Sequence, residues 1–184
     1  MKALITLICS FLLSFAASAN DFAVALGYRS NSGDAATTGF DVNTKAGFGA
    51  GVVGFFDMAP QFQIRSGFLY NQRNLSVKSG GTEADLDMAY VDIPVTAMYK
   101  FTDYAGAFAG PVLSLLASKD CKIAGGCSTS SPESMIIPIQ FGASFKFAPQ
   151  LGAELYYEAV PSTVWKDLVK NVRTVGVNLL ITFE

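Results

Sequence analysis

The 184-residue chain contains no histidine. This absence excludes the Ser-His-Asp triads, the Cys-His pairs and the histidine zinc sites on which many hydrolases depend. Only 15% of the residues are charged and the formal net charge is -2, so the chain lacks the basic surface that holds a nucleic acid backbone. Beyond the N-terminus, no apolar run reaches the roughly 18 residues that a membrane-spanning helix needs. The sequence therefore favours neither a histidine-dependent enzyme, nor a nucleic-acid-binding protein, nor a helical membrane protein.

The first 19 residues have the features of a signal peptide for general export. Lys2 supplies a short positive region, residues 3–16 form an apolar run, and Ala17-Ser18-Ala19 is a small-x-small cleavage site. We therefore predict a signal peptide over residues 1–19, cleaved after Ala19. The remainder, residues 20–184, shows no break in composition and is expected to form one domain.

Export leaves Cys121 and Cys127 as the cysteines of the mature chain. Their C-x5-C spacing matches neither a C-x-x-C redox motif nor half of a zinc site. In an oxidising compartment, the simplest prediction is a structural disulfide between them. It would lie in the long connection that we expect from Lys119 to Pro132.

Alternating apolar and polar residues predict β-strands along the mature chain, with few or no helices. In the last strand, the apolar residues are Val175, Val177, Leu179, Ile181 and Phe183, whereas most residues between them are small or polar. The same alternation predicts seven earlier strands, near residues 22–29, 42–57, 62–70, 89–101, 105–118, 135–147 and 151–159.

The predicted connections alternate in length. Short turns are expected near residues 57–61, 102–104 and 149–150, and longer connections near residues 30–38, 79–84, 119–132 and 161–171. An even number of strands with short turns at one end and long loops at the other is typical of outer-membrane barrels. The predicted fold is all-β: an eight-stranded antiparallel up-and-down transmembrane β-barrel.

Alternation does not tell which face of a barrel points outward, so a soluble periplasmic lipocalin-like barrel that binds a hydrophobic ligand is the alternative. A soluble barrel should carry many charges on its outer face. Here the polar face is mostly Gly, Ser, Thr, Asn and Gln, which suits the interior of a membrane barrel. Aromatic residues also gather beside the short turns and the termini, as in a belt at the periplasmic interface: Phe22, Phe56, Phe62, Tyr99, Phe101, Phe145, Phe147 and Phe183.

Charged residues on the polar face are expected to point into the lumen and to form ion pairs there. An eight-stranded barrel is only wide enough for side chains, so we favour a salt-bridged plug over a pore lining or a substrate site. The predicted network comprises the cations Lys45, Arg65, Arg73, Lys100 and Lys146 and the anions Asp92, Glu154 and Glu158.

No residue pattern predicts a catalytic, cofactor or metal site. Residues 49–54 fit G-x-G-x-x-G, but alternating residues follow them instead of a helix that could bind a pyrophosphate. Glu154 and Glu158 share a face but stand four residues apart, about 13 Å at the rise of a strand, which exceeds the spacing of glycosidase carboxylates.

Three prolines, Pro94, Pro111 and Pro138, lie inside predicted strands, where each removes a hydrogen-bond donor from the ladder. Pro94 and Pro111 are about equally far from the predicted turn at residues 102–104. We therefore hypothesise that one bulge, shared across this hairpin, accommodates both of them.

Several segments resemble the outer-membrane protein beta-barrel domain family, and in particular its PorT-like group of small eight-stranded barrels. They are Tyr90-Val91-Asp92-Ile93-Pro94, Tyr99-Lys100-Phe101, Ala109-Gly110-Pro111-Val112-Leu113-Ser114 and Ser66-Gly67-Phe68-Leu69-Tyr70. The resemblance covers the mature chain. It implies a place in the outer membrane of a Gram-negative envelope and does not imply a reaction.

The sequence thus predicts a non-enzymatic integral outer-membrane barrel with a plugged lumen, which acts structurally or through its outer loops. Its expected partners are outer-membrane lipid, the barrel assembly machinery and a surface partner bound by the loop from Lys119 to Pro132. We expect no cofactor and no nucleic acid, and a monomer.

Overall fold

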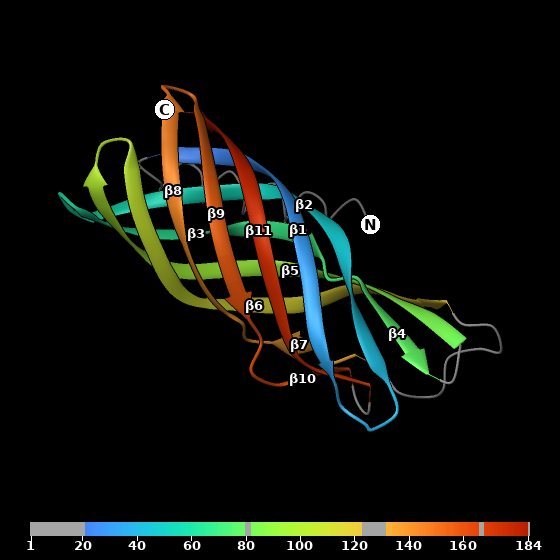
Figure 1. Cartoon of the computed structure of the whole chain (residues 1–184). Coiled ribbons are helices and arrows are strands. Elements are labelled where there is room, and N and C mark those ends of the chain that lie inside the picture. The colour runs from blue at the N-terminus through green and yellow to red at the C-terminus, as the bar shows by residue number, and fades with distance from the viewer. Residues whose placement is uncertain (1–20, 80–81, 123–131, 166–167, 184) are drawn as a thin grey trace, which may run out of the picture.

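The computed structural model describes residues 21–79, 82–122, 132–165 and 168–183, and Figure 1 shows a tilted β-barrel. The predicted signal peptide and Cys127 lie outside the described residues. Within them, no helix is long and apolar enough to cross a membrane.

Eight antiparallel strands form a closed ring, in which each strand pairs with the next one around the barrel. The ring closes where the last strand pairs with the first, from Phe22 opposite Phe183 to Ala35 opposite Val169. The predicted eight-stranded antiparallel barrel is confirmed. The ring strands are β1 (Asp21–Ala35), β2 (Asp41–Ala59), β3 (Phe62–Gln72), β5 (Thr82–Thr102), β6 (Ala105–Lys122), β8 (Ile139–Ala148), β9 (Leu151–Ala159) and β11 (Val169–Phe183).

Three short strands extend the barrel wall at the end that carries the long connections (Figure 1). β4 (Leu75–Ser79) pairs with β2 and β5, β7 (Met135–Ile136) with β6, and β10 (Thr163–Trp165) with β11. The predicted single strand over residues 135–147 is therefore wrong, because the chain leaves the ladder around Pro138 and divides into β7 and β8. The carbonyl oxygen of Pro138 still accepts a hydrogen bond from the Val112 amide, at 2.9 Å.

The ring strands also extend further at this end than predicted. Residues 30–35, expected in a loop, continue β1 and pair with β11, while β5 begins at Thr82 and β6 ends at Lys122. The backbone pairing of the strands continues here. The apolar alternation fades, because the side chains at this end no longer face lipid. We call this the outer end, and the opposite end, with the three short turns, the turn end.

The two prolines of the β5–β6 hairpin share no bulge, so that hypothesis is wrong. Pro94 pairs with Val112, and Ala97 pairs with Ala109, in one unchanged register; the shifts of this ladder lie elsewhere, at residues 89–90 and 100–102. Proline cannot donate a ladder hydrogen bond. Between the Pro94–Val112 pair and the Ala97–Ala109 pair, the described ladder contains no paired residues. In the same register, Pro111 would stand opposite Val95 in this gap.

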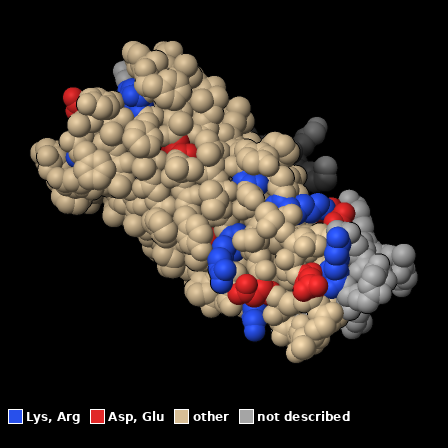
Figure 2. Space-filling view, in the orientation of Figure 1, with Lys and Arg blue, Asp and Glu red and all other residues tan. Residues whose placement is uncertain are grey.

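The apolar face of the barrel points outward, as predicted for a membrane barrel. On β11, Val175, Val177, Leu179 and Phe183 are 43–52% exposed, whereas the residues on the other face, Gly176, Asn178, Leu180 and Thr182, are buried. From Val175 to Phe183 the strand covers about 26 Å, or about 20 Å along the barrel axis at a tilt near 40°. This height is close to the roughly 25 Å apolar band of outer-membrane barrels. The middle of the barrel surface in Figure 2 is accordingly almost free of charge.

The aromatic residues expected at the turn end lie there, on the outer surface. Phe62, Phe101, Phe145 and Phe147 are each more than half exposed. Several rings pack against one another, and those of Phe62 and Tyr99 lie 5.0 Å apart. Aromatic rings suit the boundary between lipid and water, so they define one edge of the apolar band.

Leu179 lies in the middle of this band, which makes it a test of the orientation. We expect Leu179→Arg to destabilise the folded barrel by about 2–4 kcal/mol, because it places a charge near the middle of the lipid layer. Leu179→Ala, the control, removes the side chain without adding charge and should be milder. Urea unfolding in lipid vesicles, followed by heat-modifiable gel mobility, measures both. Equal midpoints for Leu179→Arg and the wild type would contradict the orientation.

Candidate functional site

The lumen holds a bidentate ion pair between Arg65 on β3 and Glu154 on β9. Arg65 Nε donates to Glu154 Oε1 over 2.6 Å, and Nη2 donates to Oε2 over 2.7 Å. Both side chains are fully buried. Asn178 Nδ2 donates a third hydrogen bond to Glu154, at 2.9 Å, and the Arg65 guanidinium lies 4.8 Å from the centre of the Phe108 ring. The pair thus joins opposite walls of the barrel.

A second group combines Arg73 with two carboxylates. Arg73 donates to Asp92 from both terminal nitrogens, at 3.0 and 2.9 Å, and to Glu158 at 2.8 Å. Asn71 Nδ2 donates a further hydrogen bond to Asp92, at 2.7 Å. One guanidinium therefore bridges carboxylates on β5 and β9, which the sequence separates by 66 residues.

Arg29 completes this group and was missing from the predicted network. Its Nη2 donates to the Tyr156 hydroxyl at 2.7 Å, and its Nη1 lies 4.0 Å from Asp92. Tyr156 stands between Gly142 and Gly176 on the neighbouring strands, and a side chain at Gly176 would collide with its ring. Arg29 falls on the inward positions of β1, so its parity on the strand was a signal that could have identified it.

These groups form a core of zero net formal charge, with three arginines and three carboxylates. Such a balance matters because an unpaired charge in a low-dielectric interior is costly. Two donors and two acceptors of the described lumen lack a protein hydrogen-bond partner, and bound water could satisfy them: Arg29 Nη1, Arg65 Nη1, Gln140 Oε1 and Glu158 Oε2.

Lys45, placed in the network by its strand parity, lies higher, towards the outer end. Its Nζ is 2.9 Å from Asp87 and 3.2 Å from Asp85. Partial burial lowers the pKa of Lys45, but hydrogen bonds to and attraction by the two carboxylates outweigh this effect and raise the pKa above its usual value. Lys45 therefore stays protonated at neutral pH and pairs with acids that the predicted network did not include.

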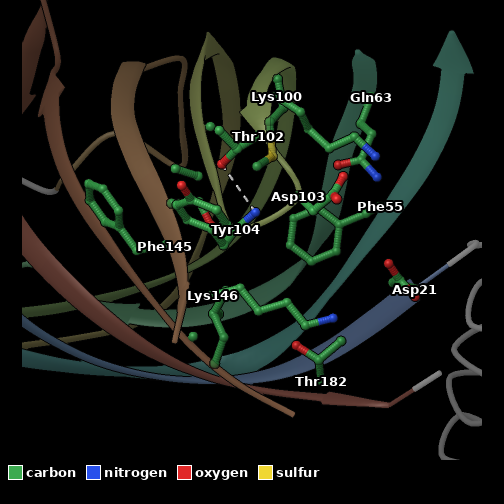
Figure 3. Close-up of a pocket in the computed structure, with 16 residues that line it drawn as sticks. Asp21, Phe55, Gln63, Lys100, Thr102, Asp103, Tyr104, Phe145, Lys146 and Thr182 are labelled. Atoms are coloured by element: carbon green, nitrogen blue, oxygen red, sulfur yellow. Dashed lines mark hydrogen bonds between the residues drawn. The ribbon is translucent and has the colours of Figure 1, made fainter. Parts of the chain in front are cut away.

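Lys100 and Lys146 lie at the turn end, where they line a pocket of about 110 Å³ (Figure 3). Lys100 Nζ is 3.7 Å from Asp57, which also accepts a hydrogen bond from Gln63 at 2.7 Å. The remaining described lining includes the charged residues Asp21 and Asp103 and the apolar residues Phe55, Met98 and Leu180. The pocket is thus of mixed charge at its sides and apolar at its base.

Two apolar clusters also occupy the described lumen. The turn-end cluster surrounds the Arg65 pair and provides the base of the pocket; it consists of Ala23, Ala25, Val53, Phe55, Leu69, Met98, Phe108, Tyr156 and Leu180. The outer cluster brings β4, β7, β10 and the outer parts of β5 and β11 together; it consists of Leu75, Val77, Leu86, Met88, Tyr90, Ile136, Val160, Val164, Trp165, Val169 and Val172.

The outer cluster was not predicted. Most of its residues lie outside the predicted strands, and only Tyr90 and Ile136 belong to them. Brief alternations, Leu75 with Val77 and Leu86 with Met88, could have signalled it. Tyr90 connects the two levels of the lumen: its ring centre lies 5.0 Å from the Arg73 guanidinium, and its hydroxyl donates to the Glu133 carbonyl at 3.0 Å.

The described residues contain no group of three or more His, Cys, Asp or Glu side chains placed to hold a metal ion. Residues 49–54, which fit G-x-G-x-x-G, lie within β2. Cys121, near the end of β6, is disulfide-bonded. Its predicted partner, Cys127, is not among the described residues, and the pairing stays a prediction.

The family model of the outer membrane protein beta-barrel domain matches residues 10–159. The chain belongs to this family. Its fold is similar to that of the attachment invasion locus protein Ail of Yersinia pestis, with a TM-score of 0.53 at 14% identity over 89% of this chain and 98% of that chain. It is also similar to OprG of Pseudomonas aeruginosa, with a TM-score of 0.51 at 12% identity over 90% and 95%. No curated protein matches the sequence.

Family and fold place the protein in the bacterial outer membrane, as predicted. The alternative of a soluble periplasmic lipocalin-like barrel is wrong. A carrier of that kind needs an apolar cavity and a charged surface, whereas this barrel has buried ion pairs inside and exposed apolar residues outside.

The Arg65 pair allows a test of how much the buried charges contribute to stability. Arg65→Met leaves the Glu154 carboxylate buried without its counter-ion, and we expect a loss of about 3–5 kcal/mol. Adding Glu154→Leu should recover part of this loss, because no buried charge remains unpaired. The control, Lys100→Met, breaks a partly exposed pair and should cost about 1 kcal/mol or less. Equilibrium unfolding in detergent micelles measures all three; similar losses for Arg65→Met and Lys100→Met would contradict the assigned roles.

Proposed function

We propose that the protein is a closed, non-enzymatic, monomeric barrel, which acts at the cell surface through its outer end or by its presence in the membrane. Residues 1–19 serve as a signal peptide that is removed after Ala19, and residues 20–184 form the barrel. The assembly machinery of the outer membrane inserts it, as it does other barrels.

The observation that carries this proposal is the filling of the lumen. The charged core and the two apolar clusters interdigitate, so buried side chains occupy the described interior from the turn end to the outer end. The pocket at the turn end is lined in part by Phe55, Met98 and Leu180, which belong to the turn-end cluster. An eight-stranded ring leaves room for little besides its side chains. We therefore expect no continuous water path through the barrel.

The carboxylates of the lumen are held in a way that suits structure better than catalysis. Glu154 accepts three hydrogen bonds from Arg65 and Asn178, and Asp92 is shared by Arg73 and Asn71. A general acid or base needs access to a substrate proton. These groups are fully buried and engaged with one another, which supports a non-enzymatic role.

The outer end is the part available to a partner. Its charges gather at one end of the molecule in Figure 2, and the described loops there rest on the outer cluster. The connection from Lys119 to Pro132 contains a disulfide-bonded residue, Cys121. A disulfide that restrains a loop lowers the entropy lost when the loop binds, so we propose this connection as the contact surface for a partner at the cell surface.

Planar-bilayer recordings test the closed lumen. We expect purified wild-type protein to give no steady ion conductance at any holding voltage that the bilayer tolerates, because the buried side chains of the lumen exclude a continuous column of water. Protein from the same preparation must show heat-modifiable mobility, which establishes that the recorded sample is folded. Reproducible unitary conductance steps from such a sample would overturn the proposal.

Replacing residues 123–131 with a short Gly-Ser linker, together with Cys121→Ser, tests the outer connection. This change spares the backbone pairing of Lys119 with Met88 and of Pro132 with Trp165, so we expect normal assembly. Pull-down from intact cells should then lose the partner captured by the wild-type bait. Cys121→Ser with Cys127→Ser is the control and should keep both assembly and at least part of the capture. Unchanged capture by the linker variant would remove the role of this connection.

A further inference from the structure

A groove of about 450 Å³ runs along the lipid-facing wall of the barrel. Its floor consists of Ala97 on β5 and Ala107 and Ala109 on β6. Ala97 stands directly opposite Ala109 in the ladder, and Tyr99 opposite Ala107. Methyl side chains on adjacent strands therefore leave a hollow between the larger aromatic side chains that border it.

Aromatic rings form the sides of the groove. Phe62 on β3 and Tyr99 on β5 border one side, with their ring centres 5.0 Å apart. Phe141 on β8 borders the other side and packs against Tyr157, at 5.2 Å. Both sides are thus braced by a neighbouring ring, so the hollow has stiff walls.

The groove lies in the half of the apolar band next to the turn end. Phe62 is the first residue of β3, and Tyr99 precedes the last residue of β5 by three positions. The Tyr99 hydroxyl donates to the side-chain oxygen of the exposed residue Gln61, at 3.1 Å. An amide has two N–H donors besides this oxygen. Polar donors therefore stand at the membrane interface, at the end of an apolar groove.

We propose that this groove binds one acyl chain of a phospholipid from the periplasmic leaflet, with the headgroup at Gln61 and Tyr99. Lipid tails are as apolar as the wall, so the preference comes from van der Waals contact with a preformed hollow and not from the hydrophobic effect. A flexible chain fills a narrow groove between stiff rings. A second copy packed with twofold symmetry would set groove against groove and would leave the hollow open.

Native mass spectrometry of the full barrel, released from detergent with its residual lipid, tests this site. We expect wild-type protein to retain one phospholipid, and Ala109→Phe, which fills the floor, to reduce the retained fraction at least tenfold. The control is Ala50→Phe on β2, an exposed position opposite Leu26 and Tyr70 and outside the groove. It should retain phospholipid as the wild type does. Equal retention by Ala109→Phe and the wild type would overturn the proposal, and so would a wild-type dimer that Ala109→Phe dissociates.

A second measurement keeps the proposal testable if Ala109→Phe fails to fold. The chain has one tryptophan, Trp165, which is buried in the outer cluster, so Trp165→Phe provides a background free of its fluorescence. In this background, Phe141→Trp places a reporter at the groove and Ala50→Trp places one on open wall. Vesicles with increasing amounts of brominated phospholipid should quench the Phe141→Trp variant at a several-fold lower fraction of brominated lipid. Identical quenching curves for the two variants would overturn the site.

Discussion

Hydrocarbon offers no hydrogen-bond partner to the backbone, so every N–H and C=O group that crosses the membrane must be paired within the protein. For a chain of strands, the solution is a closed ring, and here the β1–β11 ladder closes it. Closure with only eight strands also limits the interior to the width of side chains. The faces of the strands, the composition of the lumen and the proposed lack of an aqueous path all depend on this constraint.

The side chains of the lumen are consequently as buried as those of a protein core, but many of them are polar or charged, as on a protein surface. Its charges are tolerated because they are equal in number, mutually hydrogen-bonded and shielded at both ends by apolar residues. Asn71 and Asn178 occupy remaining acceptor sites on the carboxylates. The ion pairs connect strands on opposite sides of the ring and so stabilise its cross-section. Aliphatic residues would pack across the lumen without the fixed geometry of a hydrogen bond.

Sequence periodicity predicts the face of each residue well, because only alternate positions of a strand meet lipid. It predicts height along the barrel axis poorly. Lys45, Arg65 and Lys100 all point inward, as their parity requires, but the tilt of the strands places Lys45 at the outer end and Lys100 at the turn end. Partners therefore could not be assigned from parity alone. Strand ends were missed for a related reason: above the lipid, residues 30–35 keep their backbone pairing with β11 without the apolar alternation that would reveal it.

Whereas the membrane-spanning ring is stabilised by its closed backbone ladder, the outer end is stabilised by apolar packing in the outer cluster. There the chain is in contact with water, and open loops would be the cheaper arrangement entropically. Instead β4, β7 and β10 bring apolar side chains over the barrel opening, where Trp165 and Val164 are almost completely buried. This second core fixes the bases of the described connections, and in the proposed function it also closes the lumen. The proposed closure and the order of these connections would therefore result from the same packing, so substitutions that loosen the outer cluster should affect both together.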